Sequence, residues 1–107
     1  VFQPHRFSRI NDLFNEFCGS FNEANYVFVT DIYSAGEKAI NGINKETISM
    51  GIRDYGHKNV YTVESKNNLI EKVSNLSSSG DLVIFMGAGS ITSWSDSFIN
   101  DLDNFGK

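Results

Sequence analysis

A short, continuous apolar run at residues 26–30, Tyr-Val-Phe-Val-Thr, constrains the fold of this chain more than any other feature. Such an unbroken run, rich in β-branched side chains, is typical of a strand that is buried on both faces, as in a parallel sheet. Parallel strands need long crossover connections, which are usually helices. The sequence around this run should therefore form helices that cover both faces of a sheet.

An amphipathic helix pattern precedes the run. Apolar residues recur over residues 9–22 at the spacing i, i+3, i+4, i+7, i+8 and i+11, from Ile10 to Phe21, and Ser8 is the predicted N-cap. Cys18 lies on the apolar side of this pattern. Because it is the single cysteine, it cannot form a disulfide within the chain, which favours a reducing, cytoplasmic setting.

Strand and helix patterns alternate along the rest of the chain. The further predicted elements are a strand in the apolar start, strands at residues 59–63 and 82–86, and helices over residues 45–54, after Ser65 and after Ser90. The order β-α-β-(α)-β-α-β-α predicts an α/β fold, with a mostly parallel sheet and helices on both of its faces.

Four residues carry local predictions. Asn44 and Ser65 are suited to cap the helices that follow them, whereas Gly51 should weaken the helix over residues 45–54. His57 stands among polar neighbours, so we expect it to be a solvated loop residue.

Length and composition exclude several classes of protein. A chain of 107 residues with 40% hydrophobic content fits one small domain, and no apolar run is long enough to span a bilayer. A net charge of −4 argues against a nucleic-acid-binding groove, and no secretory signal pattern is present. The chain begins without Met inside a predicted strand, so we expect it to be part of a longer protein.

A group of cationic side chains directly follows the first predicted strand. His5, Arg6 and Arg9 lie within five residues, and Pro4 restricts the direction in which the chain leaves the strand. Ligands of open α/β sheets bind at the carboxyl ends of the strands, and a guanidinium group grips carboxylates and phosphates well. We interpret His5, Arg6 and Arg9 as an anion clamp; the alternative is a set of solvated surface charges.

Other candidate residues also follow predicted strands, so parallel strands would bring them to the same edge of the sheet. Asp31, Tyr33 and Glu37 follow the run at 26–30, and Gly87 and Gly89 follow the last strand. The two glycines could expose backbone amides to an anion at a helix start, or could simply form a tight turn. They complete neither a P-loop nor a GxGxxG pattern.

No catalytic or metal-binding set is visible in the sequence. The two histidines stand 52 positions apart and the chain has one cysteine, so the spacing of metal ligands is absent. No serine lies in a nucleophile-elbow motif. The candidate residues therefore indicate substrate binding, with no catalytic residue of their own.

Three segments carry a family resemblance. They are Phe-Gln-Pro-His-Arg-Phe-Ser-Arg at residues 2–9, Asp-Ile-Tyr-Ser-Ala-Gly-Glu at residues 31–37, and Gly-Asp-Leu-Val-Ile-Phe-Met-Gly-Ala-Gly-Ser-Ile at residues 80–91. In order and spacing they closely resemble the C-terminal, Rossmann-like domain of the alanine-adding branch of the Mur ligase family, which serves peptidoglycan synthesis.

The resemblance implies an ATP- and Mg²⁺-dependent ligation in the cytoplasm, in which L-alanine attacks an acyl phosphate of UDP-N-acetylmuramate. By motif match, Arg6 and Arg9 would hold the L-alanine carboxylate, and His5 would line the same pocket. The side chains that would shape the amino-acid side of the cleft are Asp31, Tyr33 and Glu37. The residues that would allow the backbone to come close are Gly87 and Gly89.

The resemblance also implies that much of the enzyme lies elsewhere. Residues 1–107 would be the amino-acid-binding domain without its N-terminal portion, and without the upstream domains that bind ATP and the UDP-sugar. ATP and Mg²⁺ would be held mainly outside this chain, which would bind no cofactor, metal, nucleic acid or membrane itself. The alternative is a stand-alone, non-catalytic module that binds a small carboxylate or a nucleotide.

Overall fold

A four-stranded parallel sheet forms the centre of the computed structural model, which describes residues 1–87, 89 and 91–105. The strands lie in the order β3-β2-β1-β4, and each pairs with its neighbour in parallel. Their bounds are β1 (Phe2–Gln3), β2 (Val27–Val29), β3 (Val60–Thr62) and β4 (Met86–Gly87). The prediction of an α/β fold around a parallel sheet is confirmed.

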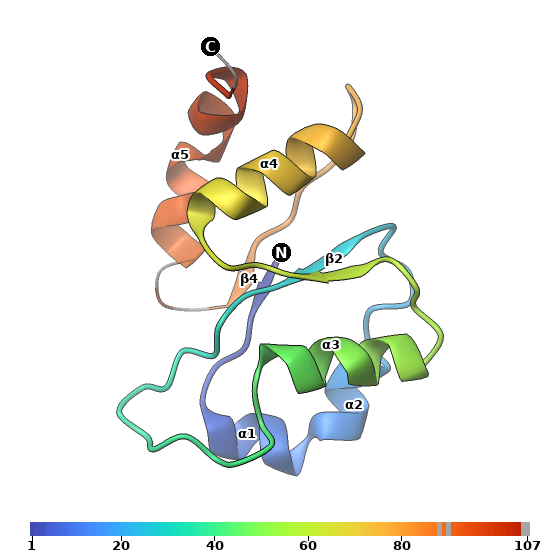
Figure 1. Cartoon of the computed structure of the whole chain (residues 1–107), viewed down its shortest axis with the longest axis vertical. Helices are drawn as coiled ribbons and strands as arrows, with labels where there is room; N and C mark the ends of the chain where they lie inside the picture. The colour runs from blue at the N-terminus through green and yellow to red at the C-terminus, as the bar shows by residue number, and fades with distance from the viewer. Residues whose placement is uncertain (88, 90, 106–107) are drawn as a thin grey trace.

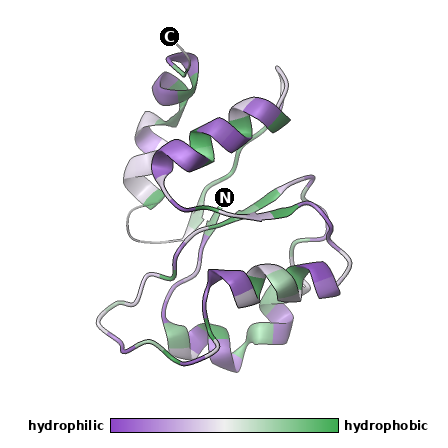
Figure 2. Ribbon diagram, in the orientation of Figure 1, coloured by the Kyte–Doolittle hydropathy of each residue, from purple (hydrophilic) through white to green (hydrophobic). Residues whose placement is uncertain are grey.

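Helices cover both faces of the sheet (Figure 1). One face carries α1 (Phe7–Asp12), α2 (Phe14–Cys18) and α3 (Lys45–Asp54), and the other carries α4 (Lys66–Leu76) and α5 (Ile91–Asp103). Neighbouring residues of β2 show this division, because Val27 and Val29 join one buried cluster whereas Phe28 joins the other. Figure 2 shows hydrophobic strands between helices that also carry hydrophilic residues, as a sheet covered on both sides requires.

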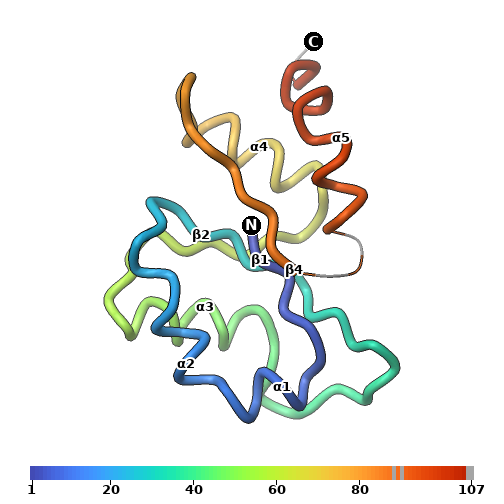
Figure 3. The backbone as a smooth tube through the Cα atoms, turned by 180° about the vertical axis from the view of Figure 1, so that it is seen from behind, coloured from blue at the N-terminus to red at the C-terminus, as the bar shows by residue number. Residues whose placement is uncertain are grey.

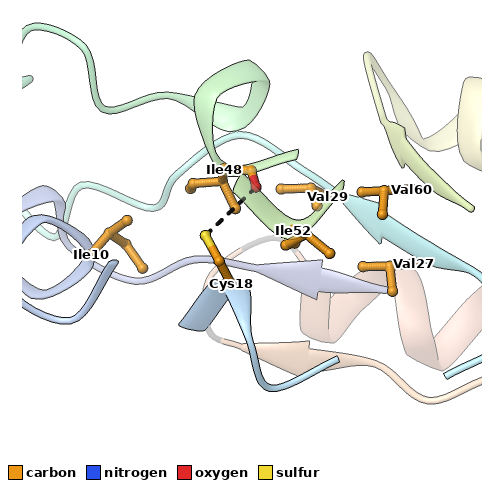
Figure 4. Close-up of a cluster of buried hydrophobic side chains, with 7 residues drawn as sticks. All are labelled: Ile10, Cys18, Val27, Val29, Ile48, Ile52 and Val60. Atoms are coloured by element: carbon orange, nitrogen blue, oxygen red, sulfur yellow. Dashed lines mark hydrogen bonds between the residues drawn. The ribbon is translucent and has the colours of Figure 1, made fainter. Parts of the chain in front are cut away.

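The cluster beneath β2 and β3 is closed to solvent (Figure 4). Ile10 of α1, Cys18 of α2, and Ile48 and Ile52 of α3 are each exposed by 1% or less. The Cys18 thiol points to the carbonyl oxygen of Ile48 at 3.9 Å. Burial raises the pKa of this thiol, with a smaller contribution from the charge of Asp54. Cys18 is therefore a core residue, as its position on the apolar stripe predicted.

The prediction of one continuous helix over residues 9–22 is wrong. Helix α1 begins at Phe7 with Arg6 at the N-cap position, and Leu13 (φ −117°, ψ 23°) separates it from α2. The break lets α2 turn toward α3, where Gly51 leaves room for it. Ser8 is not the cap, because it lies inside the first turn of α1.

The two predicted caps are confirmed, whereas the prediction for His57 is wrong. Asn44 accepts a hydrogen bond from the Thr47 amide at 2.9 Å, and Ser65 accepts one from the Asn68 amide at 3.1 Å. His57 is only 7% exposed: its Nε2 donates to the carbonyl of Ala24 at 2.6 Å, while its Nδ1 accepts from the Asn59 amide at 3.2 Å. The polar neighbours of His57 predicted that its ring nitrogens bind water, but both bind backbone groups of the chain instead.

The last strand is shorter than predicted. The run at residues 82–86 forms a strand only at Met86–Gly87, at the edge of the sheet. Its partner β1 provides few residues to pair with: the Val1 amino group donates to the Ile84 carbonyl, and the Met86 amide donates to the Val1 carbonyl, both at 2.8 Å. A run with strand character does not become a strand without a partner for its backbone.

Candidate functional site

The strand order places a topological switch beside β1. The chain proceeds from β1 to β2 to β3 on one side, and β4 then pairs with the other side of β1. Helix α1, which follows β1, lies on one face of the sheet, and α5, which follows β4, lies on the other (Figure 1). At such a switch point, α/β proteins bind ligands at the carboxyl ends of the strands.

The anion clamp lies directly at this switch, joined to the loop that follows β2. The Tyr33 amide donates to the Pro4 carbonyl, and the Arg6 amide donates to the Tyr33 carbonyl, both at 2.8 Å. The rings of His5 and Tyr33 stack with centroids 5.5 Å apart and planes 10° apart. The structure thus brings together residues that stand 28 positions apart in the sequence.

Arg6 has an unusual backbone conformation, with φ 67° and ψ 133°. This region is strained for a residue with a side chain, and such strain persists where surrounding contacts hold it. The Arg6 amide is held by Tyr33, and its carbonyl accepts from the Ile10 amide at 3.3 Å. The side chains of Arg6 and Arg9 are exposed, and within residues 1–87, 89 and 91–105 no carboxylate forms an ion pair with either.

Glu37 binds the beginning of α1. Its Oε2 accepts a hydrogen bond from the Ser8 hydroxyl at 2.6 Å, and its Oε1 accepts one from the Ser8 amide at 3.2 Å. These hydrogen bonds lower the pKa of Glu37, and the charge of Arg6 adds a smaller effect in the same direction. The carboxylate is therefore engaged by the helix that carries Arg9.

Asp31 is paired with a lysine that the sequence analysis missed. The ammonium group of Lys45 lies 3.0 Å from Asp31 Oδ1, 3.0 Å from Glu64 Oε2 and 3.0 Å from the Val63 carbonyl oxygen, and Lys45 is only 7% exposed. Burial lowers the pKa of Lys45, but its hydrogen bonds to the two carboxylates outweigh this and raise it. The helix dipole disfavours a lysine in the first turn of a helix. The position of Lys45 was therefore a sign, visible in the sequence, that its charge is paired with a carboxylate.

Gly87 and Gly89 lie against the end of β1. Gly87 has φ 132°, and a Cβ atom there would collide with the Gln3 carbonyl oxygen. Gly89 has φ 87°, and a Cβ atom there would lie 2.8 Å from Cδ2 of Tyr33. Both positions therefore need a residue without a side chain. Ala88 and Ser90, which complete the predicted glycine loop, lie outside the described residues.

Gln3 is a second residue that the sequence analysis missed. It is only 6% exposed, and its Oε1 accepts a hydrogen bond from the Ile91 amide at 3.1 Å. Its Nε2 donates to the Asp31 carbonyl at 3.3 Å. Gln3 thus links the beginning of α5 to the end of β2 across the switch. A buried amide at the end of a strand has no signal in hydrophobic periodicity.

These features define the class of the protein. An open parallel sheet with helices on both faces and a topological switch beside β1 belongs to the α/β class, whose members bind ligands at the carboxyl ends of the strands. Among the described residues, no helix has the length and apolar character needed to cross a bilayer.

Comparison with known proteins identifies the family more closely. No family model matches the chain, but many curated relatives do. UDP-N-acetylmuramate–L-alanine ligases from Parvibaculum lavamentivorans, Rhodospirillum centenum and Rhodopseudomonas palustris are 43%, 46% and 43% identical to it. The matches cover 99%, 96% and 99% of this chain, but only 22%, 21% and 23% of the relatives.

The chain therefore matches, over nearly its whole length, one segment of the UDP-N-acetylmuramate–L-alanine ligases of the Mur ligase family, and it spans about a fifth of the length of these relatives. The resemblance found in the sequence is confirmed.

Proposed function

We propose that the chain is the C-terminal, amino-acid-binding domain of an ATP-dependent ligase that joins L-alanine to UDP-N-acetylmuramate in peptidoglycan synthesis. The observation that carries this proposal is the identity of 43–46% over nearly the whole chain to proteins of that name. The unpaired arginines at the switch point support it, because an amino acid presents a carboxylate that such a site can bind.

In this function, Arg6 and Arg9 bind the carboxylate of L-alanine, while His5 lines the same pocket. Holding the carboxylate leaves the amine free to attack the carbonyl carbon of the activated sugar acid, with departure of phosphate and loss of a proton from the amine. Asp31 and Tyr33 shape the amino-acid side of the cleft, and Gly87 and Gly89 bring backbone close to it.

In this reaction ATP, together with Mg²⁺, would supply the phosphoryl group that converts the carboxylate of the sugar acid to an acyl phosphate, and we propose that both are held mainly by the rest of the protein. Among the described residues, no group of three or more His, Cys, Asp or Glu side chains is placed to ligate a metal ion. We also propose that residues 1–107 lack the N-terminal portion of the domain, and that the longer protein acts in the cytoplasm.

Kinetics of the longer protein with Arg6→Lys test the proposal. A lysine cannot reproduce the bidentate contact of a guanidinium group, and a hydrogen bond to a charged group contributes roughly 1.5–3 kcal/mol. We expect the KM for L-alanine to rise by about one to two orders of magnitude. Arg9→Ala should behave similarly, and the KM for ATP should change far less.

Arg53→Lys is the matched control. Arg53 lies in the last turn of α3 and donates to the carbonyl of Val60 at the beginning of β3, away from the switch. It should leave both KM values unchanged. A defect of Arg6→Lys confined to ATP would contradict the proposal, because it would assign the clamp to phosphate.

A further inference from the structure

Glu37 completes the helix that carries the clamp. Ser8 is the second residue of α1, and its amide is one of the donors that a helix leaves unsatisfied at its beginning. Arg6 occupies the N-cap position but makes no side-chain capping bond. Glu37, 29 residues further along the chain, accepts from both the amide and the hydroxyl of Ser8. Glu37, which lies in the loop after β2, therefore takes the role of the N-cap residue for α1.

The charge of Glu37 matches what α1 lacks. The first turn of α1 contains no acidic residue, and Arg6 stands at its N-cap position, where the helix dipole disfavours a cation, whereas Arg9 lies in the last turn. The bonds from Ser8 keep the pKa of Glu37 below its ordinary range, so this carboxylate is ionised at neutral pH. It offsets the positive end of the helix, where Arg6 lies.

The loop that carries Glu37 is itself fixed at both ends. The Glu37 amide donates to the Ser34 carbonyl at 3.0 Å across a turn in which Ala35 (φ 52°) and Gly36 (φ 87°) are left-handed. At the other end, Tyr33 bonds to Pro4 and Arg6 through its backbone. The segment from 33 to 37 therefore contacts the chain before Arg6, at Pro4, and after it, at Ser8. Figure 3 shows the loop after β2, to which this segment belongs, descending beside the connection from β1 to α1.

We propose that Glu37 is a positioning residue for the anion clamp, and this rests on the proposed function. Its carboxylate is engaged by Ser8, so we assign it this role in place of the direct part in shaping the cleft that the motif match implied. It holds the first turn of α1 in the orientation that directs Arg6 and Arg9 to one carboxylate. Removing it should therefore weaken L-alanine binding through the arginines, while the site for ATP is unaffected.

The experiment measures steady-state kinetics of the longer protein with Glu37→Ala and Glu37→Gln. The Glu37→Ala variant loses two hydrogen bonds to a charged group, so we expect the KM for L-alanine to rise about tenfold or more. The Glu37→Gln variant keeps an acceptor oxygen and should show a smaller rise. The kcat and the KM for ATP should stay within about twofold of their original values, a change well below the tenfold step.

Two further variants sharpen the test. Glu46→Gln is the matched control, because Glu46 is an exposed glutamate in the first turn of α3, where Asn44 and Thr47 form the capping box; it should change neither KM. Ser8→Ala removes one partner of Glu37. Combined with Glu37→Ala it should raise the KM no further than Glu37→Ala alone, because both changes break the same contact.

The outcomes separate this inference from the proposed function. If Arg6→Lys raises the KM for L-alanine but Glu37→Ala does not, the positioning role is wrong and the proposed function stands. If neither variant raises it, both are wrong. A Glu37→Ala variant that loses kcat and affinity for both substrates together, with a lowered Tm, would show a merely structural role and would also overturn the inference.

Discussion

Two apolar runs with the same character in the sequence have different fates in the structure. In the first run, Val27, Phe28 and Val29 of β2 are exposed by 3%, 6% and 0%. In the second, Leu82, Ile84 and Met86 are exposed by 83%, 57% and 50%, and with Tyr26 they line a groove of about 720 Å³. The comparison shows that an apolar run is buried only where helices cover both of its faces.

The alternation within the second run shows which face is covered. Val83 and Phe85 pack against the cluster formed with α4 and α5, and Phe85 meets Phe98 edge to face with centroids 5.1 Å apart. Leu82, Ile84 and Met86, which alternate with these two residues, belong to neither buried cluster. The region of β2 and β3 should therefore contribute most of the stability, and β4 little.

The largest expected difference is between Ile52→Ala and Ile84→Ala. Ile52 is fully buried, so removing its side chain leaves a cavity and should lower the free energy of unfolding by about 2–5 kcal/mol. Ile84 is more than half exposed, so the same change should lower it by less than about 0.5 kcal/mol. Urea unfolding followed by circular dichroism measures both. Equal losses would contradict the comparison, because they would mean that Ile84 is covered in solution.

The second prediction concerns the 107-residue chain on its own, in which Val1 carries a free amino group beside the groove. Burial lowers the pKa of the Val1 amino group from 8.0 to about 6. The folded chain therefore binds this proton less readily than the unfolded chain, and stability should rise as the pH increases from 6 to 8. A shift of two units corresponds to about 2.7 kcal/mol.

Urea unfolding of the 107-residue chain at pH 5.5 and pH 8.5 measures this gain. A chain acetylated at Val1 is the control: it keeps the other titrating groups but should lose this part of the pH dependence. The same pH dependence in both chains would contradict the prediction, because it would assign the effect to a group other than the Val1 amine.

The element order and the parallel sheet were predictable because hydrophobic periodicity and capping act locally. Asn44 and Ser65 cap their helices through contacts three residues away, which a linear pattern contains. The break at Leu13 was not predictable, because the apolar spacing continues through it and only the contact of α2 with α3 requires the turn. The shortening of β4 likewise depends on its partner strand.

In the candidate site, too, some features were predictable from local patterns and others depend on tertiary contacts. Parallel strands bring the loops that follow them to one edge, so the proximity of His5 and Tyr33 follows from the topology. The partners within the site depend on loop conformation. The bonds of Glu37 to Ser8 and of Lys45 to Asp31 join segments whose turns no periodic pattern encodes.

Gly51 provides the smallest of the three effects and a direct test of how tightly the covered region is packed. The sequence treats Gly51 as a weak point of α3, and alanine in a helix interior is more favourable than glycine by about 1 kcal/mol. In the structure, however, a Cβ atom at this position would lie 2.5 Å from the Cys18 sulfur and 2.9 Å from Cζ of Phe14. Overpacking of this kind costs about 1–3 kcal/mol, so Gly51→Ala should destabilise the chain despite its higher helix propensity.

The change should be measured by urea unfolding in two backgrounds. In a Cys18→Ala background the nearest obstructing atom is absent, so Gly51→Ala should cost less there than in the original chain, and the two substitutions should be non-additive. An equal cost in both backgrounds would show that Phe14, not Cys18, limits the approach of α2 to α3. A gain in stability in the original chain would mean that the two helices separate easily, and that the covered region is no more tightly packed than the edge at β4.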